Sequence, residues 1–122
     1  MDKKICLDTN VIISLIRDKN LELIEKIDAK FYTTSISVFE LWFGRRKSEN
    51  LPQLFDVLEI VDLDEESAKI AANIMLELKK EGKMINLNVL FIAAICIRNN
   101  LKLLTVNKKD FKNLEKFNLV LA

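Results

Sequence analysis

The chain has 122 residues, which suffices for one domain with a buried core and leaves little room for a second. Its 19 basic and 18 acidic residues give a net charge of +1, without the basic excess typical of proteins that bind nucleic acid non-specifically. The absence of histidine excludes Ser-His-Asp and Cys-His catalysis and most zinc sites.

The first third of the chain predicts two strands separated by helical segments. Residues 4–7 are a short apolar run that ends at Asp8, which is typical of a buried strand followed by a turn. Asn10 is a suitable N-cap for the helical pattern that follows, and Asn20 begins a second helical stretch. Residues 31–34 have the β-branched and aromatic composition of a strand.

A third helix is expected after the second strand. Either Ser35 or Ser37 can cap it, and its apolar face includes Trp42. Gly44 and the basic run of residues 45–47 lie near its end, where positive charge suits the helix dipole.

The second half of the chain contains the clearest helical signal. Residues 58–61 read as a third strand, and Asp64 then begins a long amphipathic helix that ends at Gly82. Residues 89–97 are apolar all round, so a strand and a helix both fit them. Two alanines in this run, with Asn88 as a cap, favour a buried helix.

The last elements are a strand over residues 101–106, a short helix over 108–114 and a strand over 117–121. Strands separated by helices imply right-handed β-α-β units and a parallel sheet. We therefore predict a single α/β domain over residues 1–122. Its expected architecture is a three-layer α/β/α sandwich with a central parallel sheet of four or five strands.

The apolar runs predict a soluble, cytoplasmic protein that is not bound to a membrane. The first run is too short for a signal peptide and is followed by Asp8. The longest run, residues 89–97, is far shorter than the roughly 20 residues that span a bilayer. Cys6 and Cys96 lie inside apolar runs, which predicts buried free thiols and no disulfide or metal pair.

Three polar residues are candidates for chemistry, each with a structural alternative. Asp8 and Asn107 directly follow predicted strands, so both should face the crevice at the carboxyl ends of the sheet. Asp8 can hold a hard cation such as Mg²⁺, or it can cap a helix. Glu40 lies among apolar residues and needs either a charged partner or an outward, solvated position.

Four short motifs occur in order along the chain. They are LDTN at residues 7–10, SVFEL at 37–41, IAA at 92–94 and LTVNKKDF at 104–111. Together they resemble the motifs of the PIN-domain family, and in particular its VapC-like toxin ribonucleases. The resemblance covers essentially the whole chain. It implies an endoribonuclease dependent on Mg²⁺ or Mn²⁺ that acts on single-stranded RNA, is neutralised by a small VapB-like antitoxin and often forms a homodimer.

The resemblance also assigns roles to residues. Asp8 and Glu40 match the first two acids of the catalytic metal site, and Asn107 matches the fourth position, where the family has aspartate or asparagine. In such sites, clustered carboxylates bind a metal that polarises the phosphate and activates the attacking water. Asn10, Asn86 and Asp110 are further candidates for this site. The lysines near Asp110 either contact phosphate or form a solvated face.

The third acidic position departs from the family pattern. The family places aspartate directly before the Leu-x-Ile-Ala-Ala run, where this chain has Val89. Some relatives have an acid three residues earlier, where this chain has Asn86. Asn88 is one residue out of register, about 100° around a helix, and is expected to face another way. Two functions therefore stay open: a working ribonuclease toxin with fewer ligands, or a degenerate PIN domain, weak or inactive, that binds a protein or RNA.

A partner surface is expected around Trp42 and Phe43, followed by Arg45 and Arg46. Aromatic residues and arginine are enriched in the centres of interfaces, and an antitoxin helix can lie in an apolar groove. The alternative is that both aromatic side chains belong to the core.

Overall fold

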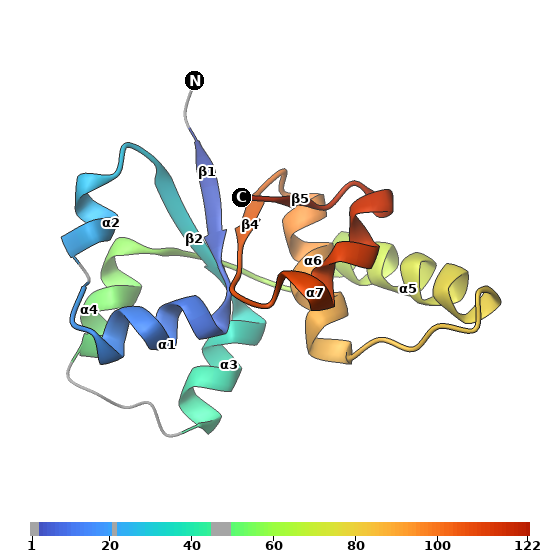
Figure 1. Ribbon diagram of the computed structural model, residues 1–122, viewed down its shortest axis with the longest axis horizontal. Coiled ribbons are helices and arrows are strands. Elements are labelled where there is room, and N and C mark those ends of the chain that lie inside the picture. The colour runs from blue at the N-terminus through green and yellow to red at the C-terminus, as the bar shows by residue number, and fades with distance from the viewer. Residues whose placement is uncertain (1–2, 21, 45–49) are drawn as a thin grey trace.

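The computed structural model of the chain describes residues 3–20, 22–44 and 50–122. A five-stranded sheet runs through it in the order β3-β2-β1-β4-β5, and all neighbouring strands are parallel (Figure 1). The strands are β1 (Lys4–Leu7), β2 (Lys30–Thr34), β3 (Glu59–Val61), β4 (Lys102–Leu104) and β5 (Val120–Leu121). The predicted parallel α/β fold is confirmed.

Helices connect the strands and cover both faces of the sheet. They are α1 (Thr9–Arg17), α2 (Glu22–Lys26), α3 (Ser35–Phe43), α4 (Asn50–Val57), α5 (Glu65–Lys80), α6 (Leu87–Arg98), α7 (Lys108–Phe111) and a short 3₁₀ helix, η1 (Lys112–Phe117). Figure 1 shows α1, α2 and α4 on one side and α5 and α6 on the other. The sheet is therefore the middle layer of three.

Two apolar cores form because side chains alternate across the strands. Leu7 and Phe31 pack with α1 and α4, whereas Cys6, Tyr32 and Leu103 pack with α5 and α6. The predicted burial of both cysteines as free thiols is confirmed. A hydrogen bond with Cys6 and burial together raise the pKa of the Cys96 thiol, which keeps it protonated and unreactive near neutral pH.

Three helices begin earlier than the sequence pattern indicated. Their N-caps are Asp8, Thr34 and Asn86, in place of Asn10, Ser35 or Ser37, and Asn88. Each true cap has extended backbone and accepts a hydrogen bond from an N–H of the first helical turn. The true caps lie one to three residues before the expected ones, because a cap depends on the backbone geometry of one residue, which the apolar periodicity of a helix does not locate.

The C-terminal third also differs in its boundaries. β4 ends at Leu104, and the side chain of the next residue, Thr105, donates to Asp8 and accepts from the backbone N–H of Asn107. The helix expected over residues 108–114 is divided into α7 and the 3₁₀ helix η1, and β5 is correspondingly short. No described helix is both long enough and apolar enough to cross a membrane.

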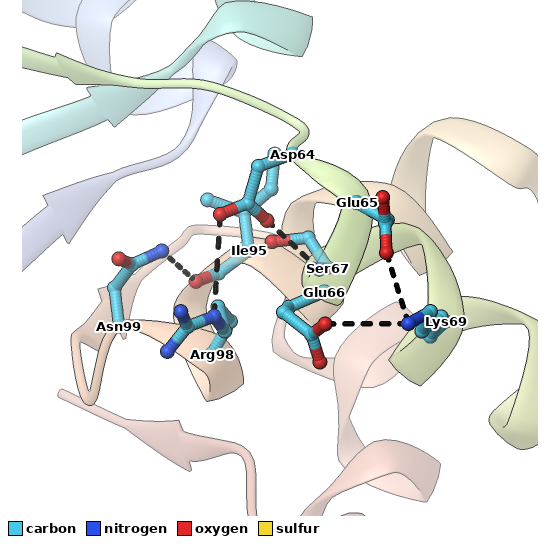
Figure 2. A network of polar contacts seen from close by, with 8 residues as sticks. All are labelled: Asp64, Glu65, Glu66, Ser67, Lys69, Ile95, Arg98 and Asn99. Atoms are coloured by element: carbon cyan, nitrogen blue, oxygen red, sulfur yellow. Dashed lines mark hydrogen bonds and ion pairs between the residues drawn. The ribbon is translucent and has the colours of Figure 1, made fainter.

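Asp64 links the start of α5 to the end of α6 (Figure 2). Its carboxylate accepts a hydrogen bond from the N–H of Ser67 at 2.8 Å and lies 4.0 Å from the Arg98 guanidinium. Figure 2 also shows the side chain of Asn99 donating to the carbonyl of Ile95, at 2.8 Å. The helix expected to begin at Asp64 is confirmed, with Asp64 as its N-cap, and Asp64 holds one end of the α5–α6 pair together.

Replacing Asp64 with Ala is expected to lower the free energy of unfolding at neutral pH. Hydrogen bonding from Ser67 lowers the pKa of the Asp64 carboxyl below its ordinary value of 3.8. The carboxylate therefore stabilises the fold above that value, and its contribution is lost as the pH falls through the folded-state pKa. Urea unfolding of the wild type and the variant, from neutral pH to below 3.8, measures this. Asp62→Ala, at an exposed neighbour, is the control, and a stability difference independent of pH would contradict the assignment.

Candidate metal centre

A cavity of about 510 Å³ lies at the carboxyl ends of β1 and β4. Its wall includes every acidic and amide residue that the sequence analysis proposed for the site: Asp8, Asn10, Glu40, Asn86, Asn107 and Asp110. Asp8 comes from the end of β1, Glu40 from α3 and Asn107 from the loop after β4. The parallel sheet therefore brings three distant segments of the chain to one crevice.

Asp8 is 5% exposed and serves both of the roles that its sequence left open, as a helix cap and as a cavity residue. Its Oδ1 accepts from the backbone N–H of Thr9 at 2.8 Å. Its Oδ2 accepts from the hydroxyl of Thr105 at 2.7 Å. The same Thr105 oxygen accepts from the N–H of Asn107 at 3.0 Å, so one hydroxyl connects the two cavity residues.

Glu40 faces the cavity from α3 and is half-buried. Its Oε1 accepts from the hydroxyl of Thr9 at 2.8 Å, and its Oε2 lies 3.4 Å from the side-chain nitrogen of Asn88, which donates to it. The alternative that Glu40 is a solvated residue on the outward helix face is therefore wrong.

Asn88 and Val89 both line the cavity, which corrects the expectation that Asn88 turns away from it. α6 begins at Leu87, so these two residues belong to its first turn, and that end of the helix meets the cavity. At the end of a helix, consecutive side chains of the first turn can all reach the same cavity. In the middle of a helix, the rotation of 100° between consecutive residues would point them in different directions. Asn86 also lines the cavity, but its side-chain oxygen accepts from the N–H groups of Asn88 and Val89.

Three buried hydroxyl residues at the site were missed by the sequence reasoning: Thr9, Ser37 and Thr105. The available signal was their place in the chain, since each lies one to three residues from a strand end or from a candidate acid. Hydroxyl groups there can bind carboxylates without adding charge.

Asp8 and Glu40 face the cavity without a cationic partner within the described ranges. Their hydrogen-bond donors are neutral hydroxyl, amide and backbone groups. Partly buried carboxylates are costly without positive charge, and a bound cation offsets that cost. The oxygen-only donor set, with no imidazole or thiolate, fits a hard divalent cation. Residues 3–20, 22–44 and 50–122 contain no group of three or more Asp, Glu, His or Cys side chains arranged to hold a metal.

The aromatic residues of α3 are exposed, so the alternative that they belong to the core is wrong. Phe39 is 60% and Phe43 77% exposed, and their rings stack with centroids 5.6 Å apart. Trp42 is 42% exposed beside them. Arg45 and Arg46, expected to extend this surface, lie outside the described residues.

Comparison with known proteins found relatives that are similar over most of the chain. The chain is 43% identical over 89 residues to ribonuclease VapC3 of Methanocaldococcus jannaschii, covering 73% of this chain and 94% of that protein. It is 34% identical over 119 residues to ribonuclease VapC2 of Haemophilus influenzae, covering 89% and 90%.

Solved structures are similar over nearly the full length. VapBC2 from Rickettsia felis, bound to a promoter DNA fragment, has a TM-score of 0.77 and 30% identity, covering 97% of this chain and 96% of that one. DNA-bound VapBC from Salmonella typhimurium has a TM-score of 0.79 and 25% identity, covering 98% and 97%. The model of the PIN domain matches residues 5–116, and the chain belongs to the PIN-domain family.

Proposed function

We propose that this protein is a VapC-type toxin, an endoribonuclease that depends on a divalent metal and hydrolyses RNA phosphodiester bonds. One observation carries the proposal: Asp8 and Glu40 meet Asn107 at one cavity and have only neutral hydrogen-bond donors. The relatives named ribonuclease VapC, similar over most of the chain, support the same reaction class. We further propose that residues 1–122 form a single domain.

Each cavity residue has a separate role in the proposed reaction. Asp8 and Glu40 would bind Mg²⁺ or Mn²⁺ through carboxylate oxygens, and Asn107 would add a neutral oxygen. When bound, the cation supplies Lewis-acid polarisation of the phosphate and a water activated for in-line attack. Lys109 lines the same cavity, and its positive charge would attract an RNA phosphate. Thr105 orients Asp8 and the backbone of Asn107 through its hydroxyl.

A second function is favoured by one specific feature, the apolar side chain of Val89 on the cavity wall. A divalent site with one carboxylate fewer binds its cation more weakly, since ligand charge sets affinity. In this alternative the chain is a degenerate PIN domain, catalytically weak or inactive, that binds RNA or a protein partner.

Cleavage of RNA by the purified protein separates the two functions. We expect cleavage of a structured RNA with single-stranded loops to rise as Mg²⁺ or Mn²⁺ is titrated, to stop with EDTA and to return when Mn²⁺ is restored. Glu40→Gln is the control, because it keeps the shape of the side chain and removes its charge. Cleavage equal in the control would identify a contaminating nuclease, and RNA binding without cleavage at saturating Mn²⁺ would favour the degenerate domain.

We also propose an antitoxin partner and a homodimer. Both similar solved structures described above are VapBC assemblies, and both are described as bound to DNA. An exposed aromatic group on α3, formed by Phe39, Trp42 and Phe43, has the composition that dominates protein interfaces. An apolar antitoxin helix would bury this group, in the manner of helix-in-groove recognition.

A further inference from the structure

A chain of three buried hydroxyl groups leads to the Glu40 carboxylate. The oxygen of Thr34 lies 3.3 Å from that of Ser37, and Ser37 lies 2.9 Å from the hydroxyl of Thr9. Thr9 in turn lies 2.8 Å from Glu40 Oε1. Thr34 and Ser37 are fully buried, and Thr9 is nearly so.

The number of hydroxyl hydrogens determines which group donates in each of these hydrogen bonds. Each hydroxyl has one hydrogen to donate, and an ionised carboxylate can only accept. Thr9 must therefore donate to Glu40, so the short Thr9–Ser37 contact requires Ser37 to donate to Thr9. Thr34 then donates to Ser37 and accepts from the backbone N–H of the same residue, at 3.1 Å. Each hydroxyl hydrogen in the chain thus has an acceptor.

This series of hydroxyl hydrogen bonds connects the segment that contains Asp8 with the helix that contains Glu40. Thr9 directly follows Asp8 and is the first residue of α1, whereas Ser37 lies one turn before Glu40 on α3. Residues three apart on a helix share a face, so Ser37 and Glu40 reach Thr9 together. The contact of Glu40 with Asn88, at 3.4 Å, is longer than ordinary hydrogen bonds and restrains the other oxygen less.

We propose that Thr9 is a positioning residue that holds the Glu40 carboxylate in a geometry able to bind a divalent cation, and that Ser37 fixes the orientation of the Thr9 hydroxyl. The inference rests on the proposed function in treating Glu40 as a ligand. With one acidic position replaced by Val89, the remaining carboxylates depend more on such neighbours for their placement. Residues that orient metal ligands typically change affinity by about 10- to 100-fold when removed.

Calorimetric titration of Mn²⁺ into the metal-free full chain tests this. We expect Thr9→Val to weaken Mn²⁺ binding by about 10- to 100-fold, and Thr9→Ser, which keeps the hydroxyl, to restore most of it. Ser37→Ala should have an intermediate effect, because Thr9 can still donate to Glu40. Ser35→Ala is the matched control, since Ser35 lies in the same turn of α3 but its hydroxyl accepts from the N–H of Leu63. Thermal unfolding in EDTA establishes that each variant is folded.

The outcomes separate this inference from the nuclease proposal. Equal Mn²⁺ affinity of the wild type, Thr9→Val and Ser37→Ala would overturn the positioning role and leave the ribonuclease proposal intact. If Thr9→Val does not fold, the comparison of Ser37→Ala with Ser35→Ala decides in the same way. If the wild type binds Mn²⁺ but cleaves no RNA, only the nuclease proposal is overturned. The Mn²⁺ affinities of the wild type, Thr9→Val and Ser37→Ala then still decide whether Thr9 positions Glu40. A wild type that binds no Mn²⁺ overturns both.

Discussion

Replacing Asp8 with Asn is expected to abolish metal-dependent RNA cleavage. Asp8 faces the cavity without a cationic partner in the described part of the chain, and the variant removes its charge while keeping its shape. Since loss of a residue that merely supports a ligand costs about 10- to 100-fold, loss of a ligand's charge should cost more than about 100-fold. Initial rates of RNA cleavage at saturating Mn²⁺ measure the effect.

The thermal stability of the Asp8→Asn variant shows whether Asp8 acts as a metal ligand or only as a helix cap. The amide oxygen of Asn can still accept from the N–H of Thr9, whereas its nitrogen cannot accept from Thr105, a loss of about 1 kcal/mol. Removing repulsion between Asp8 and Glu40 acts in the opposite direction. We therefore expect a metal-free thermal midpoint similar to that of the wild type or higher. A clear loss of stability with unchanged cleavage would show that Asp8 acts only as a cap.

Replacing Val89 with Asp should raise Mn²⁺ affinity and nuclease activity together. By the resemblance to the family, Val89 stands where the third acid is expected. It lines the cavity and is half-buried, with one side packed against the core, so a carboxylate there is expected to point into the cavity. It also lies in the first turn of α6, where the helix dipole favours negative charge. A gain of tenfold or more in affinity corresponds to at least about 1.4 kcal/mol.

Leu87→Asp is the matched control for this gain. Leu87 lies in the same first turn and is exposed, but it is not part of the cavity wall, so its variant adds the same charge to the helix end without adding a ligand. Calorimetry with Mn²⁺ and cleavage assays on the wild type and both variants distinguish the effects. Equal binding by the wild type and folded Val89→Asp would mean that the third ligand comes from elsewhere and that the assigned register is wrong.

Local patterns were sufficient to predict most of the fold. The apolar run of β1, the amphipathic pattern of α5 and the alanine-containing run inside α6 each depend on neighbours within a few residues, and these elements formed as expected. Their alternation implied the parallel sheet. Helix starts were displaced because a cap is decided by backbone geometry at one residue, to which periodicity is insensitive. The family motifs suggested that Asp8, Glu40 and Asn107 share a crevice, and all three line one cavity.

Contacts between distant residues were decided only by the tertiary structure. Thr9 reaches Glu40 across 31 positions, and Thr105 reaches Asp8 across 97, separations for which no local pattern carries information. Asn88 faces the cavity because α6 begins there, a fact about the placement of a helix end that its periodicity does not contain. The sequence by itself determined the element types and the candidate acids. The packing of α1, α3 and α6 around the sheet ends determined which neutral groups hold those acids, because hydrogen bonds depend on distance in space.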